Sequence, residues 1–201
     1  MKKILFNDKF GFTKAVLEGR KTQTRRIVPN KFFTSQWDTS NDTLVIEDDY
    51  AGFVDIRETK FCRYRKNEIV AVAQSYRDCG GLNEQGLPKW EIIAQSVGAI
   101  SAGWDNKMFV KSELMPHQIR ITDIRVDRLK DISDEDCLKE GVRKVVNENG
   151  IYVQYYVGRG DNACSFENPR EAFAHLINKV SRKDVWKENP YVFVYDFELV
   201  K

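Results

Sequence analysis

Residues 190–200 carry the strongest structural signal in the chain, an alternation of side chains with a period of two. One set consists of Tyr191, Phe193, Tyr195, Phe197 and Leu199, and the other of Val192, Val194, Asp196 and Glu198. This period is typical of a β-strand, because successive side chains of a strand point to opposite faces. The strand requires a sheet that covers a hydrophobic core, and we expect all of the first set to lie in that core.

Residues 118–129 form a second strand of the same type. Apolar Ile119, Ile121, Ile124 and Val126 are separated by charged side chains. The alternation breaks between Ile121 and Ile124, and such a break is typical of a β-bulge, where one strand carries an extra residue. We therefore expect a long strand with a bulge near its middle.

The remaining elements are short and spread along the chain. Strands are predicted at residues 2–6, 22–28, 43–47, 52–56, 68–74 and 151–157, with 60–64 as a further candidate. Helices are predicted at 8–17, from the cap Ser133 to Gly141, from the cap Asn168 onward, and near 91–97 within a long loop over 77–112. Strands that outnumber helices favour an α+β domain or a small barrel with flanking helices.

The 201 residues suit one elaborated domain, so we expect a single domain over 1–201. The 32 basic and 30 acidic residues give a net charge of only +2, which does not demand a nucleic-acid partner. The start Met1-Lys2-Lys3 precedes too short an apolar run for a signal peptide. No apolar stretch has the length of a membrane span. These features predict a cytoplasmic protein that does not enter a membrane.

The sequence offers no metal-binding pattern. The cysteines and histidines are widely spaced, without the close ligand pairs of a zinc site. They are Cys62, Cys79, Cys137, Cys164, His117 and His175. We expect buried or incidental thiols, no metal and no cofactor.

A local concentration of basic residues lies at 14–26, within an almost neutral chain. It contains Lys14, Arg20, Lys21, Arg25 and Arg26, with one acid, Glu18. Gly19 ends the preceding helix. The simplest interpretation of this segment is a solvent-exposed basic surface without a functional role.

The alternative is a reactive site. A lysine amine can act as a general base if burial or neighbouring cations lower its pKa, and a threonine hydroxyl becomes a nucleophile beside such a base. Arginines in such a setting bind phosphate. Lys21 and Thr24 are therefore candidates for the chemistry, and the arginines for binding.

Several segments resemble proteins of the ASCH family, including those common in phage and prophage genomes. The first is Gly19-Arg20-Lys21-Thr22-Gln23-Thr24-Arg25-Arg26, which is similar to the G-x-K-T-x-T-x-R signature of that family. The downstream segments are 66–72, 115–116, 120–121, 126–136, 140–141 and 186–197. Together they cover about half of the chain and run from end to end.

The resemblance implies a PUA-like β-barrel with flanking helices and two insertions, at about 30–60 and 77–115. It also implies amide hydrolysis of N4-acetylcytidine and related acylated cytosines, carried out by a lysine, a threonine and a glutamate. Lys21, Thr24 and Glu140 match these three. Glu140 as a surface acid at a helix end is the alternative interpretation, although a carboxylate is poorly placed at a helix C-terminus.

Further binding residues are expected around this set. They are Gly19, Arg20, Arg25, Arg26, Gln74 and His117. Gln74 stands where phage-type relatives often carry a glutamate, so it can hydrogen-bond a base but cannot act as an acid. A plain structural role is the alternative for Gln74 and for His117.

Three functions remain open at this point. The first is a site for a nucleoside or nucleobase that hydrolyses the amide of an acylated cytidine. The second is a non-catalytic module that binds single-stranded RNA through Lys21, Arg25 and Arg26. The third is an ASCH-type ribonuclease in which the same basic site holds the scissile phosphate.

Overall fold

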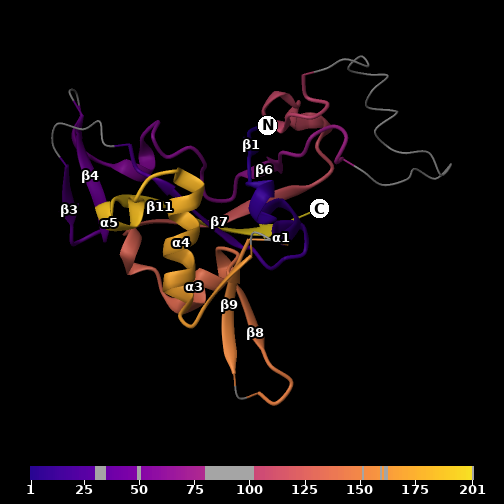
Figure 1. Ribbon diagram of the computed structural model, residues 1–201. Helices are drawn as coiled ribbons and strands as arrows, with labels where there is room; N and C mark the ends of the chain where they lie inside the picture. The colour runs from indigo at the N-terminus through magenta and orange to yellow at the C-terminus, as the bar shows by residue number, and fades with distance from the viewer. Residues whose placement is uncertain are drawn as a thin grey trace.

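The computed structural model describes residues 1–29, 35–48, 51–79, 102–150, 152–158, 160 and 163–200. Within them the chain has a mixed α+β fold with one five-stranded and two three-stranded sheets (Figure 1). The α+β prediction is confirmed. None of the helices in these ranges has the length and apolar character needed to cross a bilayer.

The five-stranded sheet has the strand order β1-β6-β7-β11-β2. Its strands are β1 (Lys3–Ile4), β6 (Ile69–Val72), β7 (Gln118–Arg128), β11 (Tyr191–Leu199) and β2 (Gln23–Ile27). Only the β1–β6 pair is parallel. β2, which carries the basic motif, pairs with β11 on one side and forms an edge of the sheet.

The bulge predicted in the long strand is confirmed. Asp196 of β11 pairs with Asp123 of β7, whereas the next residue, Phe197, pairs with Ile121. Thr122 is therefore the extra residue, and it lies where the alternation breaks.

β11 is buried on both faces. Phe193, Tyr195 and Phe197 lie in one core, whereas Val192 and Val194 lie in a second core beneath helix α4. Leu199 was predicted to be in the core, but its exposed fraction is 39%. This prediction is wrong because Leu199 is the last residue of the strand, where the side chains that pack against the sheet end.

A second sheet lies in the predicted insertion at about 30–60. It consists of β3 (Ser35–Asp38), β4 (Thr43–Asp48) and β5 (Gly52–Asp55), in that order. The β4–β5 hairpin was predicted and β3 was not. Leu44 and Ile46 of β4 are buried in the same core as Phe193 of the main sheet. The insertion therefore contributes to the core.

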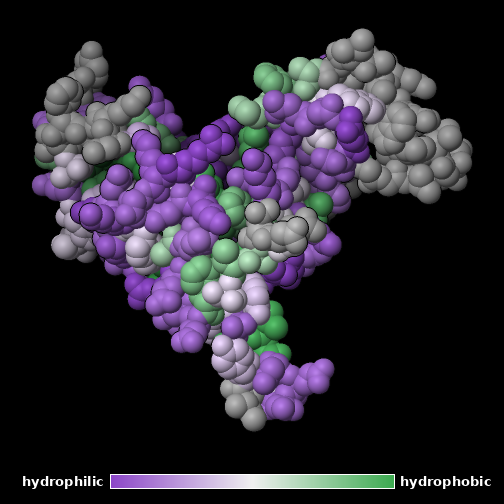
Figure 2. All heavy atoms as spheres, viewed as in Figure 1, coloured by the Kyte–Doolittle hydropathy of each residue, from purple (hydrophilic) through white to green (hydrophobic). Residues whose placement is uncertain are grey.

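The third sheet has the order β10-β9-β8. Its strands are β8 (Arg143–Val146), β9 (Val153–Val157) and β10 (Cys164–Phe166), of which only β9 was predicted. The β8–β9 hairpin projects from the body of the molecule (Figure 1). Figure 2 shows a mainly hydrophilic face on which the hairpin carries hydrophobic side chains, and Val145 and Val146 are each 47% exposed.

The helices are short except for α4. They are α1 (Phe12–Leu17), α3 (Asp134–Lys139), α4 (Pro169–Ser181) and α5 (Val185–Glu188). Single 3₁₀ turns are η1 (Asp8–Phe10), η2 (Ile56–Glu58), η3 (Lys107–Phe109), η4 (Ser112–Leu114) and η5 (Leu129–Asp131).

The predicted helix at 8–17 is divided at Gly11, whose φ of +72° lies in the left-handed region. Ser133 and Asn168 cap α3 and α4 as predicted, each accepting a backbone N–H bond. Residues 60–64 form turns and bends, so that strand prediction is wrong. The helix predicted near 91–97 lies outside the described residues.

Candidate active site

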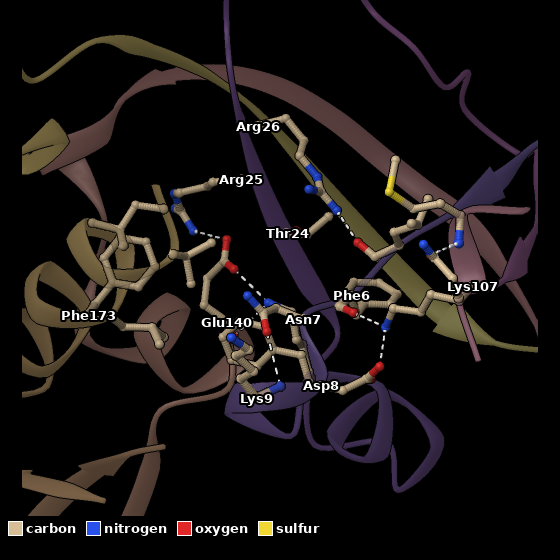
Figure 3. Close-up of a pocket in the computed structure, with 18 residues that line it drawn as sticks. Phe6, Asn7, Asp8, Lys9, Thr24, Arg25, Arg26, Lys107, Glu140 and Phe173 are labelled. Atoms are coloured by element: carbon tan, nitrogen blue, oxygen red, sulfur yellow. Dashed lines mark hydrogen bonds and ion pairs between the residues drawn. The ribbon is translucent and has the colours of Figure 1, made fainter. Parts of the chain in front are cut away.

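A cavity of about 490 Å³ opens beside the edge strand β2. Its polar side consists of Lys21, Thr24, Arg25, Arg26 and Glu140. One apolar wall comes from α4, through Phe173, Leu176, Ile177 and Val180. Residues 5–9, Phe12 and residues 106–108 complete the lining (Figure 3). A volume of this size fits a small organic ligand, since such sites measure roughly 300–1,000 Å³.

Lys21 lines this cavity and is only 2% exposed. Its Nζ donates to the carbonyl oxygen of Gln23 at 2.8 Å. It also donates to Glu140 twice, at 2.6 Å to the carbonyl oxygen and at 2.7 Å to Oε2. The Phe12 ring lies 4.8 Å from Nζ. Lys21 is therefore a buried amine in a fixed position.

Glu140 occupies the C-cap position of α3. A carboxylate is disfavoured at a helix C-terminus, but here the Lys21 ammonium donates to the Glu140 carbonyl oxygen and compensates the helix dipole. The chain then turns at Gly141, whose φ is +107°. A Cβ atom at Gly141 would approach the Phe12 ring to 3.2 Å. A glycine here therefore lets the end of α3 lie close to α1.

Arg25 holds the other side of the Glu140 carboxylate. Its Nη1 donates to Glu140 Oε1 at 3.3 Å and to the side-chain oxygen of Gln23. Its Nη2 donates to Asp136 Oδ2 at 2.9 Å. Figure 3 shows Arg25 and Glu140 pointing toward each other. The two oxygens of Glu140 are thus divided between Arg25 and Lys21.

A further layer of charged groups supports Arg25. Arg125 of β7 donates to Asp136 Oδ2 at 2.6 Å and to Asp196 Oδ2 at 2.5 Å. The Gln23 amide donates to Asp196 Oδ1 at 2.7 Å and to Asp136 Oδ1 at 3.2 Å. Sequence reasoning missed this layer, because its members come from three strands and a helix far apart in the chain. The only local signal was the S-x-x-D cap, which names Asp136 without its partners.

Thr24 presents a hydroxyl to the cavity. The residue lies in β2 opposite Tyr195 of β11 and is 5% exposed. Its hydroxyl makes no hydrogen bond with any described part of the chain. A hydroxyl without a hydrogen-bond partner that lines the same cavity as a buried lysine is suited to nucleophilic chemistry.

The pKa of Lys21 lies below its ordinary value of 10.5. Burial is the largest cause, since it disfavours the ammonium form. The Glu140 carboxylate opposes this effect, whereas the positive charges of Arg26 and Arg25 add to it. The pKa of Lys21 is therefore lower than that of an exposed lysine.

Two lysines, Lys3 and Lys107, connect the segment 106–110 beside the cavity to the N-terminal segment. Lys107 Nζ contacts Asp8 Oδ2 at 2.7 Å and also donates to Thr13 Oγ1 and to the carbonyl oxygen of Phe6. Lys3 Nζ donates to the carbonyl oxygens of Met108 and Val110, each at 2.7 Å. These bonds fasten residues 106–110 to the N-terminal segment. The Met108 side chain lines the cavity and is 64% exposed.

The structure brings five of the nine predicted site residues to this cavity. They are Lys21, Thr24, Glu140, Arg25 and Arg26. Arg26 is exposed and donates from Nη2 to the carbonyl oxygen of Leu5 at 2.9 Å.

The other four predicted residues do not line the cavity. Gly19 adopts a φ of +70° after α1, and Arg20 pairs with Glu18 through Nε at 2.9 Å. Gln74 donates to the carbonyl oxygen of Asp78 at 3.2 Å and lines a separate hollow. The backbone carbonyl of His117 accepts a bond from the Val72 N–H.

No group of three His, Cys, Asp or Glu side chains suited to a metal ion occurs in the ranges that the structure describes. Cys62, Cys79 and Cys137 are buried and Cys164 is partly exposed, all as free thiols. Burial raises the pKa of the Cys137 thiol to about 12, which keeps it protonated and unreactive.

Comparisons of the chain with protein families, with curated proteins and with solved structures found no match.

Asp136 should make the stability of the fold depend on acid pH. Burial raises its pKa and is the largest single effect, but the bonds and charges of Arg25 and Arg125 outweigh it, so the pKa lies below 3.8. A carboxylate of this kind stabilises the fold fully above its unfolded pKa, and the contribution is lost as the pH falls through the folded pKa. We expect Asp136→Asn to lower the free energy of unfolding at pH 7 by about 1.5–3 kcal/mol.

Urea unfolding from pH 7 down to pH 2 measures this dependence. The difference between the wild type and Asp136→Asn should shrink below about pH 4. Asp131→Asn is the control, because Asp131 is exposed and makes no ion pair with the described residues. A difference that stays constant over the whole range would contradict the linkage.

Proposed function

We propose that this chain is an ASCH-type protein that hydrolyses the amide of N4-acylated cytidine. One observation carries the proposal: Lys21, Thr24 and Glu140 line the same cavity, although Glu140 lies far from the other two in the sequence. This is the set that the ASCH resemblance implies. A basic surface stretch with incidental threonines would not require a buried lysine paired with that glutamate at 2.7 Å.

The proposal includes a PUA-like barrel as the underlying fold. The main sheet and the β3-β4-β5 sheet share one hydrophobic core, formed from residues such as Leu44, Val70, Ile119 and Phe193. Strands packed around a common core support a barrel-like arrangement.

The reaction would proceed by acyl transfer. Thr24 Oγ1 attacks the acyl carbonyl carbon, while Lys21 in its neutral form accepts the hydroxyl proton. The C–N bond then breaks, and Lys21 returns the proton to the leaving N4 amino group of cytidine. Water hydrolyses the ester on Thr24, which releases the carboxylic acid and restores the hydroxyl. Glu140 holds Lys21 in position throughout.

The walls of the cavity fit a ligand with this composition. Phe173, Leu176 and Ile177 supply an apolar surface for a flat base or an acyl group, and the polar residues lie opposite. Binding sites for small molecules combine a mainly apolar lining with a few fixed polar groups in this way.

The two phosphate-binding alternatives fit the geometry less well. Both terminal nitrogens of Arg25 already bind side chains, at Gln23, Glu140 and Asp136. Arg20 pairs with Glu18 outside the cavity. Of the three motif arginines only Arg26 remains exposed at the cavity for a phosphate. Lys9 and Lys107 also line the cavity, but Lys107 Nζ is already paired with Asp8 Oδ2 at 2.7 Å.

Incubation of the purified protein with N4-acetylcytidine tests the proposal. We expect cytidine and acetate to appear in equal amounts, at a rate proportional to the protein concentration. Chromatography of the products measures both. Absence of cytidine at protein concentrations close to that of the substrate would overturn the proposal. Shortened RNA products, or salt-dependent RNA binding without turnover, would favour the alternatives.

A further inference from the structure

We propose that Arg25 is a positioning residue that holds the Glu140 carboxylate in place beside Lys21. The inference rests on the proposed function, because it concerns the same site. It adds a residue that the Lys21, Thr24 and Glu140 set does not include. It also accounts for the further layer of charged groups that supports Arg25.

The geometry is that of a carboxylate held from two sides. Lys21 donates to Glu140 Oε2 at 2.7 Å and Arg25 donates to Oε1 at 3.3 Å. The side-chain exposures are 2% for Lys21, 7% for Glu140 and 1% for Arg25. Because both oxygens have donors, the carboxylate cannot rotate without losing a bond. Glu140 therefore presents a fixed acceptor to the Lys21 amine.

Arg25 is itself held by Asp136, and by Gln23, whose backbone carbonyl also accepts from the Lys21 amine. Asp136 accepts from Nη2 at 2.9 Å, and Gln23 accepts from Nη1. Arg125 holds Asp136 in turn, at 2.6 Å. Buried ion pairs such as these often contribute less stability than apolar residues of the same volume would. Their presence at a cavity favours a role in setting charge and position.

The charges around Lys21 indicate what that role is. Glu140 faces it from the end of α3, Arg25 and Arg26 belong to β2, and the Phe12 ring faces it from α1. Without Arg25, the carboxylate of Glu140 would act on Lys21 alone and would hold its proton more tightly. Arg25 balances that carboxylate and adds a like charge near the amine, and both effects favour the neutral base.

The test measures the protonation of Lys21 directly, without any substrate. An NMR titration of the Lys21 side-chain ¹³Cε signal gives the midpoint of protonation in the folded 23.4 kDa chain. We expect Arg25→Met to raise this midpoint by about one pH unit or more. Arg20→Met is the matched control, since Arg20 belongs to the same motif but pairs with Glu18 away from the cavity. It should leave the midpoint unchanged.

Two further variants guard against misfolding of Arg25→Met. Arg25→Met combined with Asp136→Asn removes one cation and one anion together, so the buried layer keeps its charge balance, and the Lys21 midpoint should still rise. Arg25→Lys keeps the charge and should leave the midpoint closer to that of the wild type. An unchanged midpoint in a folded Arg25→Met or double variant would overturn the inference.

Activity supplies the second measurement. The pH at which hydrolysis of N4-acetylcytidine reaches half of its maximum should move upward with the Lys21 midpoint, while KM changes little. A merely structural Arg25 would lower the rate at every pH without this shift. If the wild type does not hydrolyse the substrate, the proposed function fails, but the NMR result still decides the role of Arg25.

Discussion

Under the proposed function, replacing Thr24 with alanine should reduce hydrolysis of N4-acetylcytidine by at least about 10³-fold, because the nucleophile of an acyl-transfer reaction carries most of the chemical step. The Thr24 hydroxyl has no partner in the described structure and lines the cavity, so its removal leaves no broken hydrogen bond behind. The free energy of unfolding should therefore change little. The rate constant kcat should fall much more than KM rises.

Thr24→Ser and Thr22→Ala are the controls for this result. Serine keeps the hydroxyl and should retain activity to within about tenfold. Thr22 lies two residues earlier in the motif and does not line the cavity, so Thr22→Ala should be almost as active as the wild type. Steady-state kinetics with product chromatography measures all three. A Thr24→Ala variant that keeps wild-type activity would exclude a threonine nucleophile, and Lys21 would then have to act on water.

Replacing Glu140 with leucine should lower the free energy of unfolding by about 3–5 kcal/mol, because it leaves buried cations without their carboxylate. Lys21 loses a partner at 2.7 Å and Arg25 one at 3.3 Å, and their side chains are only 2% and 1% exposed. Glu140→Gln should cost less, since the amide oxygen still accepts one hydrogen bond. Urea unfolding at pH 7 measures both values.

A double-mutant cycle separates the ion pair from general packing. Lys21→Met together with Glu140→Leu removes both charges, so its cost should be smaller than the sum of the two single costs. Glu135→Leu is the control on the same helix, because Glu135 is exposed, and it should change stability by less than about 0.5 kcal/mol. If Glu140→Leu costs no more than Glu135→Leu, the buried pair does not stabilise the fold in the way that its geometry indicates.

Buried ion pairs hold the polar side of the cavity. Lys21, Glu140, Arg25 and Asp136 form a continuous set of buried ion pairs, and each charged group has an opposite partner within 3.3 Å. Preorganised polar groups of this kind lower the cost of reorganisation during a reaction. Thr24 is the member of the polar side that remains without a hydrogen bond, which suits a group that must react.

Local sequence patterns predicted the elements that depend on neighbours in the chain. The alternation at 118–129 predicted both β7 and its bulge, because a strand repeats every two residues. Ser133 and Asn168 predicted two helix starts, because capping involves only residues two or three positions apart. Gly11 was the exception, since its left-handed conformation divides a segment whose apolar pattern alone indicates one helix.

The strands that were not predicted lie in segments with weak sequence patterns. β3, β8 and β10 are short and are held mainly by their partner strands, as in the register of Cys164 with Val157. Their residues show no clear alternation, and tertiary context overrides β-propensity in such strands. The predicted position of Leu199 failed for a related reason: the alternation gives its face, whereas its exposure depends on where the covering elements end.

For the site, the sequence by itself determined which residue types were available: a glycine to end α1, then Lys21 just before a strand, and Thr24, Arg25 and Arg26 within it. It also indicated Glu140, through the resemblance of the segment around it to ASCH proteins. Only the tertiary structure decided that Lys21 and Glu140 are buried together at 2.7 Å, and that Arg20, Gln74 and His117 lie away from the cavity. The physical reason is that burial and charge pairing depend on contacts between distant segments, here β2 with the end of α3, and local periodicity carries no information about such contacts.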